Sequence, residues 1–189
     1  MRRRRADAQR HGEAILDAAL QVLGSRPQAS IEDVATAAGV SRQTVYAHFP
    51  SRDALVAAAL ERASADAMAA VDAAAPDEGS ATDALLRLLS ASWDAFRHHR
   101  LIFEAAGADR AADADARHVP MTERLDALVR RGQRAGEFAA DLDPGWVVAA
   151  VIALGHAAGE RAVREQVPLD VAEAQFTSSV LRLCGPDGP

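Results

Sequence analysis

Closely spaced helix start and stop signals between Ser30 and Ser51 constrain the fold of this chain more than any other feature. Ser30 is suited to cap the start of a helix, and Gly39 is suited to end it by adopting a left-handed backbone. Ser41 then caps a further helix, which Pro50 ends. The spacing therefore predicts two short helices, one between Ser30 and Gly39 and one at about 42–48, joined by a tight turn.

The rest of the chain is also expected to be helical. Alanine, the best helix former, occurs 45 times among 189 residues, against 24 of the β-branched residues that sheets favour. This balance predicts an all-α fold. Hydrophobic periodicity and helix-ending residues predict helices at about 8–24, 51–75, 82–98, 121–134, 146–165 and 169–184, with a short helical piece at 101–106. Residues 108–117 fit a helix and a mobile loop equally well.

Two short helices joined by a turn that contains a glycine form the helix-turn-helix pattern. Its second helix would expose Arg42, Gln43, Thr44 and Tyr46. Arginine and glutamine are the side chains best suited to bidentate contacts with guanine and adenine in the major groove. Thr44 can contact a base methyl group or a phosphate, and contacts from Tyr46, His48 and Arg52 to phosphates would position the helix. The capping residues Ser30 and Ser41 complete the predicted DNA-binding set.

The same stretch resembles the amino-terminal domain of the TetR family of transcriptional regulators, over roughly residues 12–60. The resemblance is carried by the segment 14–19 and by Ile31, Val34-Ala35, Ala38-Gly39-Val40-Ser41, Thr44-Val45-Tyr46, His48-Phe49, Ser51-Arg52 and Leu55. The sequence departs from the family at two places. Arg52 stands where the family often has lysine, and residues 25–28 replace the glycine and the aromatic residue that often precede the first short helix. The resemblance implies an all-α homodimer with a helix-turn-helix DNA-binding domain (1–52) and a helical effector-binding and dimerisation domain (53–189). A ligand-responsive repressor that binds a palindromic operator in double-stranded DNA is the function expected of such a chain.

Three further sets of residues are predicted to take part. Arg2, Arg3, Arg4 and Arg5 form a flexible arm that can lie on phosphates or enter a narrow minor groove. The heptad-like spacing of Leu169, Phe176, Val180 and Leu183, with the small residues Ala149 and Ala153 on the preceding helix, predicts the dimer interface. The pocket for an unknown small-molecule effector is predicted from the few large apolar residues outside the DNA-binding domain, namely Trp93, Phe96, Phe103, Met121, Leu125 and Trp146.

Other functions find less support in the sequence. It offers no glycine-rich phosphate loop, no paired histidines and no cysteine spacing typical of metal sites, so we expect no enzyme activity, no metal and no cofactor. An interaction module that has lost DNA binding, or a regulator without an effector, remains the alternative. The single cysteine, Cys184, excludes an internal disulfide, and the apolar run from Trp146 to Ala158 is too short to span a bilayer. These features favour a cytoplasmic protein.

The net charge of −6 argues at first against a nucleic-acid ligand. The charge is segregated, however. Residues 1–60 carry 8 arginines against 6 acidic residues, whereas the remainder carries 13 arginines against 21 acidic residues. The predicted DNA-binding domain thus keeps a modest positive charge, as a phosphate-binding domain requires.

Overall fold

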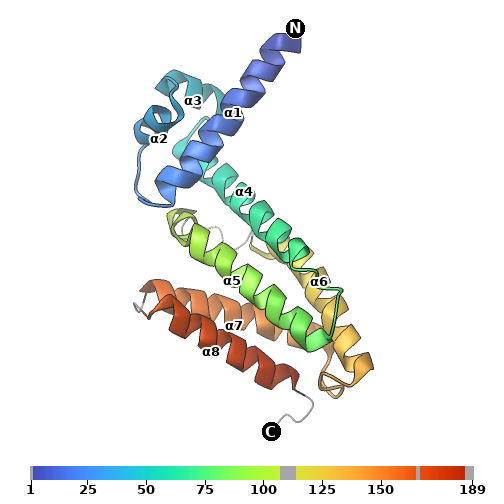
Figure 1. The fold of residues 1–189 in the computed structure, drawn as a ribbon. Coiled ribbons are helices and arrows are strands. Elements are labelled where there is room, and N and C mark those ends of the chain that lie inside the picture. The colour runs from blue at the N-terminus through green and yellow to red at the C-terminus, as the bar shows by residue number, and fades with distance from the viewer. Residues whose placement is uncertain (1, 107–113, 165–166, 186–189) are drawn as a thin grey trace. The chain divides into compact units, whose positions relative to one another are not determined.

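The computed structural model describes the backbone of residues 2–106, 114–164 and 167–185, and the side chains of 10–102, 119–164 and 167–185. Within these ranges the regular structure is entirely helical, which confirms the predicted all-α fold (Figure 1). The helices are α1 (Arg2–Leu23), α2 (Ile31–Ala38), α3 (Arg42–His48), α4 (Arg52–Ala73), α5 (Ala81–Ala106), α6 (Ala114–Ala135), α7 (Pro144–Arg164) and α8 (Leu169–Cys184).

The chain divides into two compact units. The first comprises Met1–Ala65 and His98–Ala114, and the second comprises Asp66–Arg97 and Asp115–Pro189. Helices α4 and α5 therefore each contribute to both units. The DNA-binding domain predicted at 1–52 lies within the first unit, and its boundary stays a prediction.

The core of the first unit fixes α1, α2 and α3 against one another. Ile15 of α1, Val34 of α2 and Val45 of α3 are each no more than 1% exposed, and Leu55 of α4 packs with them. Val45 is the one buried residue among the seven of α3. A single buried anchor on so short a helix leaves most of its surface free for another role.

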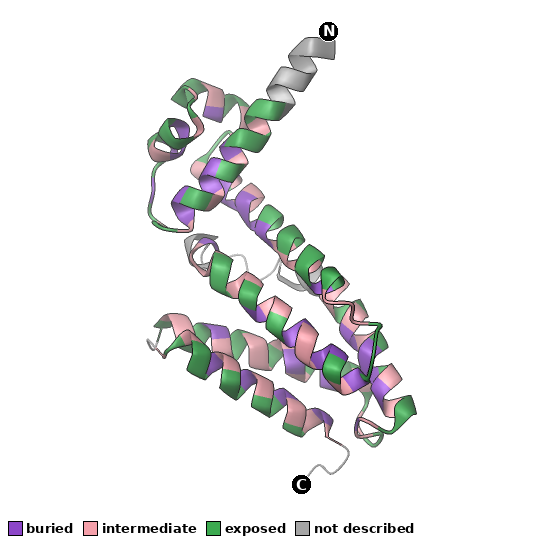
Figure 2. Ribbon diagram, in the orientation of Figure 1, coloured by how far each residue is buried: buried purple, intermediate pink, exposed green. Residues whose placement is uncertain are grey.

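The second unit has a separate core between α5, α6, α7 and α8 (Figure 2). It is built on apolar residues of these helices, including Leu85, Leu88, Trp93, Leu125, Val129, Val148, Val151, Phe176 and Val180. Two arginines hold the α4–α5 loop in this unit. Arg87 donates to the carbonyl oxygens of Ala74 and Ala75, at 2.9 Å each, and Arg131 donates to that of Pro76 at 3.0 Å.

Some helix bounds differ from the prediction. Helix α5 continues through 101–106 instead of breaking near residue 98, and α6 begins at Ala114, before the predicted start at Met121. Helix α1 begins at Arg2, so the backbone of the predicted arm is helical. Residues 107–113, most of the stretch left undecided, lie outside the described part, whereas 114–117 form the first turn of α6.

Helix α7 is longer than its apolar run suggested. It has 21 residues, and by length and a mean hydropathy of 1.3 it could cross a membrane, although only 22% of the apolar window is buried within this chain. Core helices of water-soluble proteins meet the same criterion. Because Val147, Val148 and Val151 of α7 lie in the core of the second unit, this helix is weak evidence for a membrane segment.

Candidate nucleic-acid interface

The turn between α2 and α3 is built by the residues that predicted it. Gly39 adopts a left-handed backbone (φ 66°, ψ 28°), and its N–H donates to the carbonyl oxygen of Thr36 at 3.2 Å. Only glycine and, less readily, asparagine adopt this conformation without strain. Ser41 caps α3, because its hydroxyl accepts from the Thr44 N–H at 3.1 Å. The two helices are therefore fixed by local hydrogen bonds as well as by the shared core.

Helix α3 presents a continuous polar face to solvent. Because Val45 points into the core, Arg42, Gln43 and Tyr46 are exposed, and Thr44 and His48 are half-buried. A helix of this width fits the major groove of B-form DNA, where arginine and glutamine can contact base edges. The structure thus brings Arg42, Gln43 and Tyr46 together on one exposed surface, as the sequence predicted.

Arg42 is held from two sides in this surface. Its guanidinium lies 5.4 Å from the centroid of the Tyr46 ring, and its Nη2 donates to the Tyr46 hydroxyl at 3.3 Å. On the other side, its Nη1 lies 3.7 Å from Oε2 of Glu32 in α2. The charge is therefore positioned above an aromatic ring yet remains exposed to a ligand.

Glu32 was not among the predicted site residues. Its proximity to Arg42 results from the turn, which brings the first turn of α2 beside the first turn of α3. A carboxylate beside an arginine that is predicted to contact a base would compete with DNA for the same donors. No periodic pattern in the sequence indicates this pair, because the two residues lie on different helices.

Three predicted DNA-contacting residues have structural roles in this chain. The Ser30 hydroxyl accepts from the Asp33 N–H at 3.2 Å, and the Asp33 carboxylate accepts from the Ser30 N–H at 2.8 Å, which completes a capping box at α2. The Ser30 hydroxyl also donates to this carboxylate at 2.6 Å. Arg52 donates from Nε to the carbonyl oxygen of Ala29 at 3.1 Å and from Nη2 to that of Pro27. Arg52 thus holds the segment that leads into α2. Its Nε and Nη2 donors, which the sequence predicts to contact a phosphate, donate to backbone carbonyl oxygens of the chain itself. Ser41 caps α3.

The remaining predicted positions on this unit are less defined. His48 lies beside α1, since a Cβ placed on Gly12 would be 3.4 Å from its Nδ1. The side chains of Arg2, Arg3, Arg4 and Arg5 lie outside the described residues. Their contact with DNA stays a prediction.

Five of the six predicted effector-pocket residues have described side chains, and their lining of a common pocket stays a prediction. Trp93 and Leu125 are buried in the core of the second unit, and Met121 and Phe96 are half-buried against it. Trp146, in contrast, is 64% exposed. The Phe103 side chain lies outside the described residues. Among the described side chains, no group of three or more metal-ligating residues is found.

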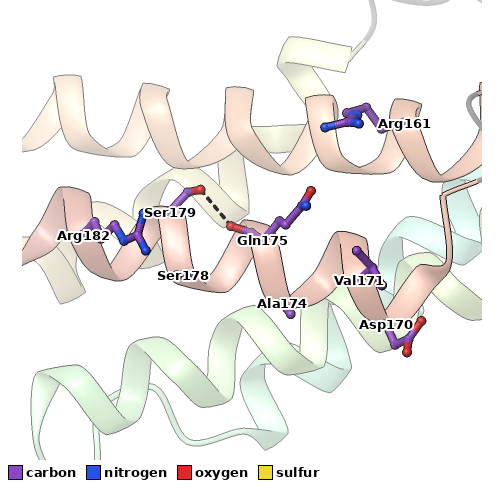
Figure 3. A pocket seen from close by; sticks show the side chains of 8 residues that line it. All are labelled: Arg161, Asp170, Val171, Ala174, Gln175, Ser178, Ser179 and Arg182. Carbon is purple, nitrogen blue, oxygen red and sulfur yellow. Dashed lines mark hydrogen bonds between the residues drawn. The ribbon is translucent and has the colours of Figure 1, made fainter.

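The predicted dimer residues fall on two different faces. Phe176 and Val180 are 7% and 0% exposed within the subunit, so their seam packs against the chain's own core rather than against a partner. Leu169 and Leu183 are half-buried against the same core, whereas Ala149 and Ala153 of α7 are exposed. Exposed residues of α8 line a pocket together with Arg161 of α7, and Figure 3 shows their side chains: Asp170, Val171, Ala174, Gln175, Ser178, Ser179 and Arg182.

Comparisons with known proteins agree with this site. The sequence profile of bacterial regulatory proteins of the tetR family matches residues 15–59, which include α2 and α3. The HTH-type transcriptional repressor LfrR of Mycolicibacterium smegmatis is 29% identical over 179 residues, which cover 93% of each chain.

Solved structures of regulators are also similar to this chain. The crystal structure of the TetR-like regulator LfrR from Mycobacterium smegmatis in complex with proflavine is 26% identical, with a TM-score of 0.68 over 96% of this chain and 97% of that one. The fatty acid degradation regulator FadR of Bacillus halodurans shares the fold, with a TM-score of 0.75 at 17% identity, over 90% of this chain and 94% of that one.

An exposed polar α3, fixed by a capped α2 and a left-handed turn in an all-helical chain, defines a helix-turn-helix transcriptional regulator. The sequence and structural similarities cover both units of the chain. Residues 15–59 match the tetR family of bacterial regulatory proteins, and nearly the whole chain is similar to TetR-like transcriptional regulators.

Proposed function

We propose that this chain is a cytoplasmic, homodimeric repressor that binds a palindromic operator and releases it when a small-molecule effector binds the second unit. The observation that carries the proposal is the exposed face of α3, where Arg42, Gln43 and Tyr46 stand together around one buried anchor, Val45. Repression is supported by the similarity to LfrR, which is itself described as a transcriptional repressor.

Dimerisation follows from what a single α3 can achieve. One short helix contacts only a few base pairs, whereas two copies related by a two-fold axis contact half-sites one DNA turn, or about 34 Å, or a multiple of it, apart. The exposed side of α7 and α8 is suited to a second copy. It offers Ala149 and Ala153 of α7 and Val171 and Ala174 of α8, and small residues let helices approach closely.

The effector is proposed to bind the second unit because that unit has a core of its own, separate from the one that fixes α3. Helix α4 runs from the first unit into the second. A ligand that prefers one arrangement of the second unit can therefore change the population of the protein conformation that binds DNA. The solved LfrR structure with proflavine supports a small-molecule ligand for a relative of this chain.

Fluorescence anisotropy with the DNA upstream of the chain's own gene tests the proposal. We expect a preference for one palindromic segment over scrambled DNA of equal length, and an affinity that falls with salt with a slope of about −0.9 for each phosphate neutralised. A chain that binds neither DNA in a salt-dependent manner, or binds both equally, would contradict it. A screen of small aromatic molecules for release of that segment tests the response to an effector.

A further inference from the structure

An acidic side chain lies at the edge of the face of α3 that we propose contacts DNA. The Glu32 side chain, in the first turn of α2, is 70% exposed, and its Oε2 lies 3.7 Å from Nη1 of Arg42. Phosphates repel a carboxylate, and this repulsion lowers the affinity for DNA of every sequence. The position of Glu32 is therefore not explained by affinity, and its effect on the choice between sequences has to be considered.

The local structure of α2 fixes the place of this carboxylate. Ile31 and Val34, on either side of it in the sequence, are buried in the core of the first unit, and the capping box fixes the first turn. The Asp33 carboxylate accepts from the Ser30 N–H at 2.8 Å and is therefore used by the cap. Of the two acidic residues in this turn, Glu32 is the one whose carboxylate lies beside α3.

The chemistry of the Glu32–Arg42 pair matches that of a G·C base pair. In the major groove, guanine presents the acceptors N7 and O6, and the paired cytosine presents its N4–H donor. Arginine supplies donors to guanine, whereas a carboxylate only accepts and is suited to cytosine. Guanine O6 and cytosine N4 are hydrogen-bonded to each other, about 2.9 Å apart, which is close to the 3.7 Å between Arg42 Nη1 and Glu32 Oε2. The protein thus holds a donor and an acceptor side by side at the spacing that one base pair requires.

We propose that Glu32 is a specificity-determining residue whose carboxylate accepts from N4 of the cytosine that pairs with the guanine contacted by Arg42. Arg42 of α3 and Glu32 of α2 then read both strands of one base pair, while Tyr46 supports the guanidinium. Repulsion by phosphates acts on all DNA, but only the correct base offsets it with a charge-assisted hydrogen bond, so discrimination between sequences increases. Guanine or thymine in place of this cytosine would present an acceptor to the carboxylate and be rejected. The inference rests on the proposed operator binding and adds α2 to the elements that contact bases.

DNA that contains N4-methylcytosine tests the contact directly. When this base pairs with guanine, its methyl group replaces the N4 hydrogen that faces the major groove, and the base pair is kept. Binding-site selection with Arg42→Ala first identifies the pair that Arg42 contacts, which we expect to be G·C. Anisotropy titrations then compare the operator with a copy that carries N4-methylcytosine at this pair in one half-site. The native chain should bind the methylated copy about tenfold more weakly, as expected for loss of a hydrogen bond to a charged group.

Two variants at position 32 separate this contact from an effect of charge alone. Glu32→Ala removes the acceptor and should bind the two operators equally. Glu32→Gln removes the same charge but keeps an acceptor, so its difference between the operators should lie between those of Glu32→Ala and the native chain. Glu78→Ala removes an exposed carboxylate in the second unit and should keep the tenfold difference. A role of Glu32 limited to the dipole of α2 would instead make Glu32→Ala and Glu32→Gln respond identically, which would overturn the inference.

The remaining outcomes distinguish this inference from the proposed function. Equal binding of the two operators by the native chain, or a tenfold difference that survives in a folded Glu32→Ala protein, would overturn the inference and leave operator binding intact. An Arg42→Ala protein that relaxes the preference at no G·C pair would also overturn it. A native chain without any sequence preference would contradict the regulator function and the inference together.

Discussion

Arg42, which we propose contacts DNA, is held by one neighbour that would favour this contact and by one that would compete with it. Tyr46 lies under its guanidinium and accepts a hydrogen bond, whereas the carboxylate of Glu32 attracts the same group from the side. Both members of the ion pair are exposed, so the pair itself adds little stability. The pair is expected to lower the affinity for DNA instead, because the carboxylate repels phosphates and occupies donors that a base or phosphate would use.

Glu32→Gln is therefore expected to bind operator DNA about twofold to fivefold more tightly, the range that exposed ion pairs of this kind support. The gain should be largest at low salt, because screening weakens the repulsion. Anisotropy titrations at two salt concentrations measure it. Glu78→Gln makes the same charge change on an exposed loop of the second unit and should leave the affinity unchanged. An equal gain in both variants would assign the effect to net charge rather than to Arg42.

Gln43 and Tyr46 are expected to separate specificity from affinity. Gln43→Ala removes an exposed amide suited to adenine and should relax the preference at one base position of each half-site, by about 1–3 kcal/mol. Tyr46→Ala removes a phosphate donor together with the support of Arg42, so it should weaken binding to all sequences with little change in preference. Binding-site selection followed by sequencing measures both. The opposite pattern would assign base preference to Tyr46 and overall affinity to Gln43.

The sequence predicted that Arg42, Gln43 and Tyr46 are exposed on α3, but it did not predict the contacts that some other site residues make within the chain. One buried valine and helical spacing are enough to say which side chains point outward. Arg52 shows the limit: its guanidinium reaches carbonyl oxygens more than twenty positions earlier in the chain, a contact that no local pattern encodes.

The start of α2 depends on a reciprocal cap whose strength varies with pH. Ser30→Ala removes the acceptor for the Asp33 N–H and should lower the free energy of unfolding by about 1 kcal/mol, as measured by urea denaturation. Hydrogen bonds from Ser30 hold the pKa of Asp33 below its ordinary value of 3.8. A lowered pKa in the folded state means that ionised Asp33 stabilises the fold, and that this contribution is lost as the pH falls through the lowered pKa.

Asp33→Asn should accordingly be less stable than the native chain at about pH 7, and the difference should shrink as the pH falls below about 4. Urea denaturation of both proteins across this range measures the trend. Asp141→Asn, at an exposed position between α6 and α7, serves as the matched carboxylate control. A difference between Asp33→Asn and the native chain that stays constant with pH would contradict the role of the ionised cap.

Two helix glycines are expected to respond oppositely to alanine. A Cβ on Gly132 of α6 would lie 2.2 Å from Cδ2 of Phe138, which is 4% exposed, so Gly132→Ala should cost about 1–3 kcal/mol through overpacking. A Cβ on Gly155 of α7 would meet Phe176 at 3.5 Å, an ordinary contact, so the helix propensity of alanine should make Gly155→Ala neutral or slightly stabilising. Thermal unfolding of both variants measures the difference. Similar losses in both would indicate that Gly155 also needs its small size.

The sequence predicted which segments are helical, but it did not predict where all of these helices begin and end. Ser30, Gly39, Ser41, Gly136 and Pro168 mark ends because they act on the local backbone. The expected break after residue 98 is absent because His98, His99 and Arg100 are polar but place no glycine or proline in the helix, so the hydrogen-bond ladder of α5 continues. Conversely, Pro120 lies inside α6 and does not start it.

At the scale of the whole chain, the sequence predicted the resemblance to TetR-family regulators and the segregation of charge, but not which side of α8 is exposed. Heptad-like spacing indicates a seam and does not say whether the neighbouring helix belongs to the same chain. Packing answers that question, because Phe176 and Val180 are already covered by the subunit's own core. The side available to the proposed partner is therefore the exposed one that carries Val171, Ala174 and Ser178.

Ala174→Arg places a large charge on this free side and should convert the proposed dimer into a monomer, as measured by sedimentation. Loss of the second half-site should then weaken operator binding by about 10²–10⁴-fold, since the two α3 helices no longer bind as one linked unit. Thr122→Arg makes the same substitution type at an exposed position of α6 and should change neither property. Because an exposed substitution outside an interface changes stability by only about 0.5 kcal/mol, Thr122→Arg should also keep the melting temperature of the native chain. A helical circular-dichroism spectrum of the Ala174→Arg protein should show that its monomer is folded. A dimer that survives Ala174→Arg would place the contact elsewhere on the molecule, and a native chain that is monomeric at micromolar concentration yet binds its operator would contradict the dimer altogether.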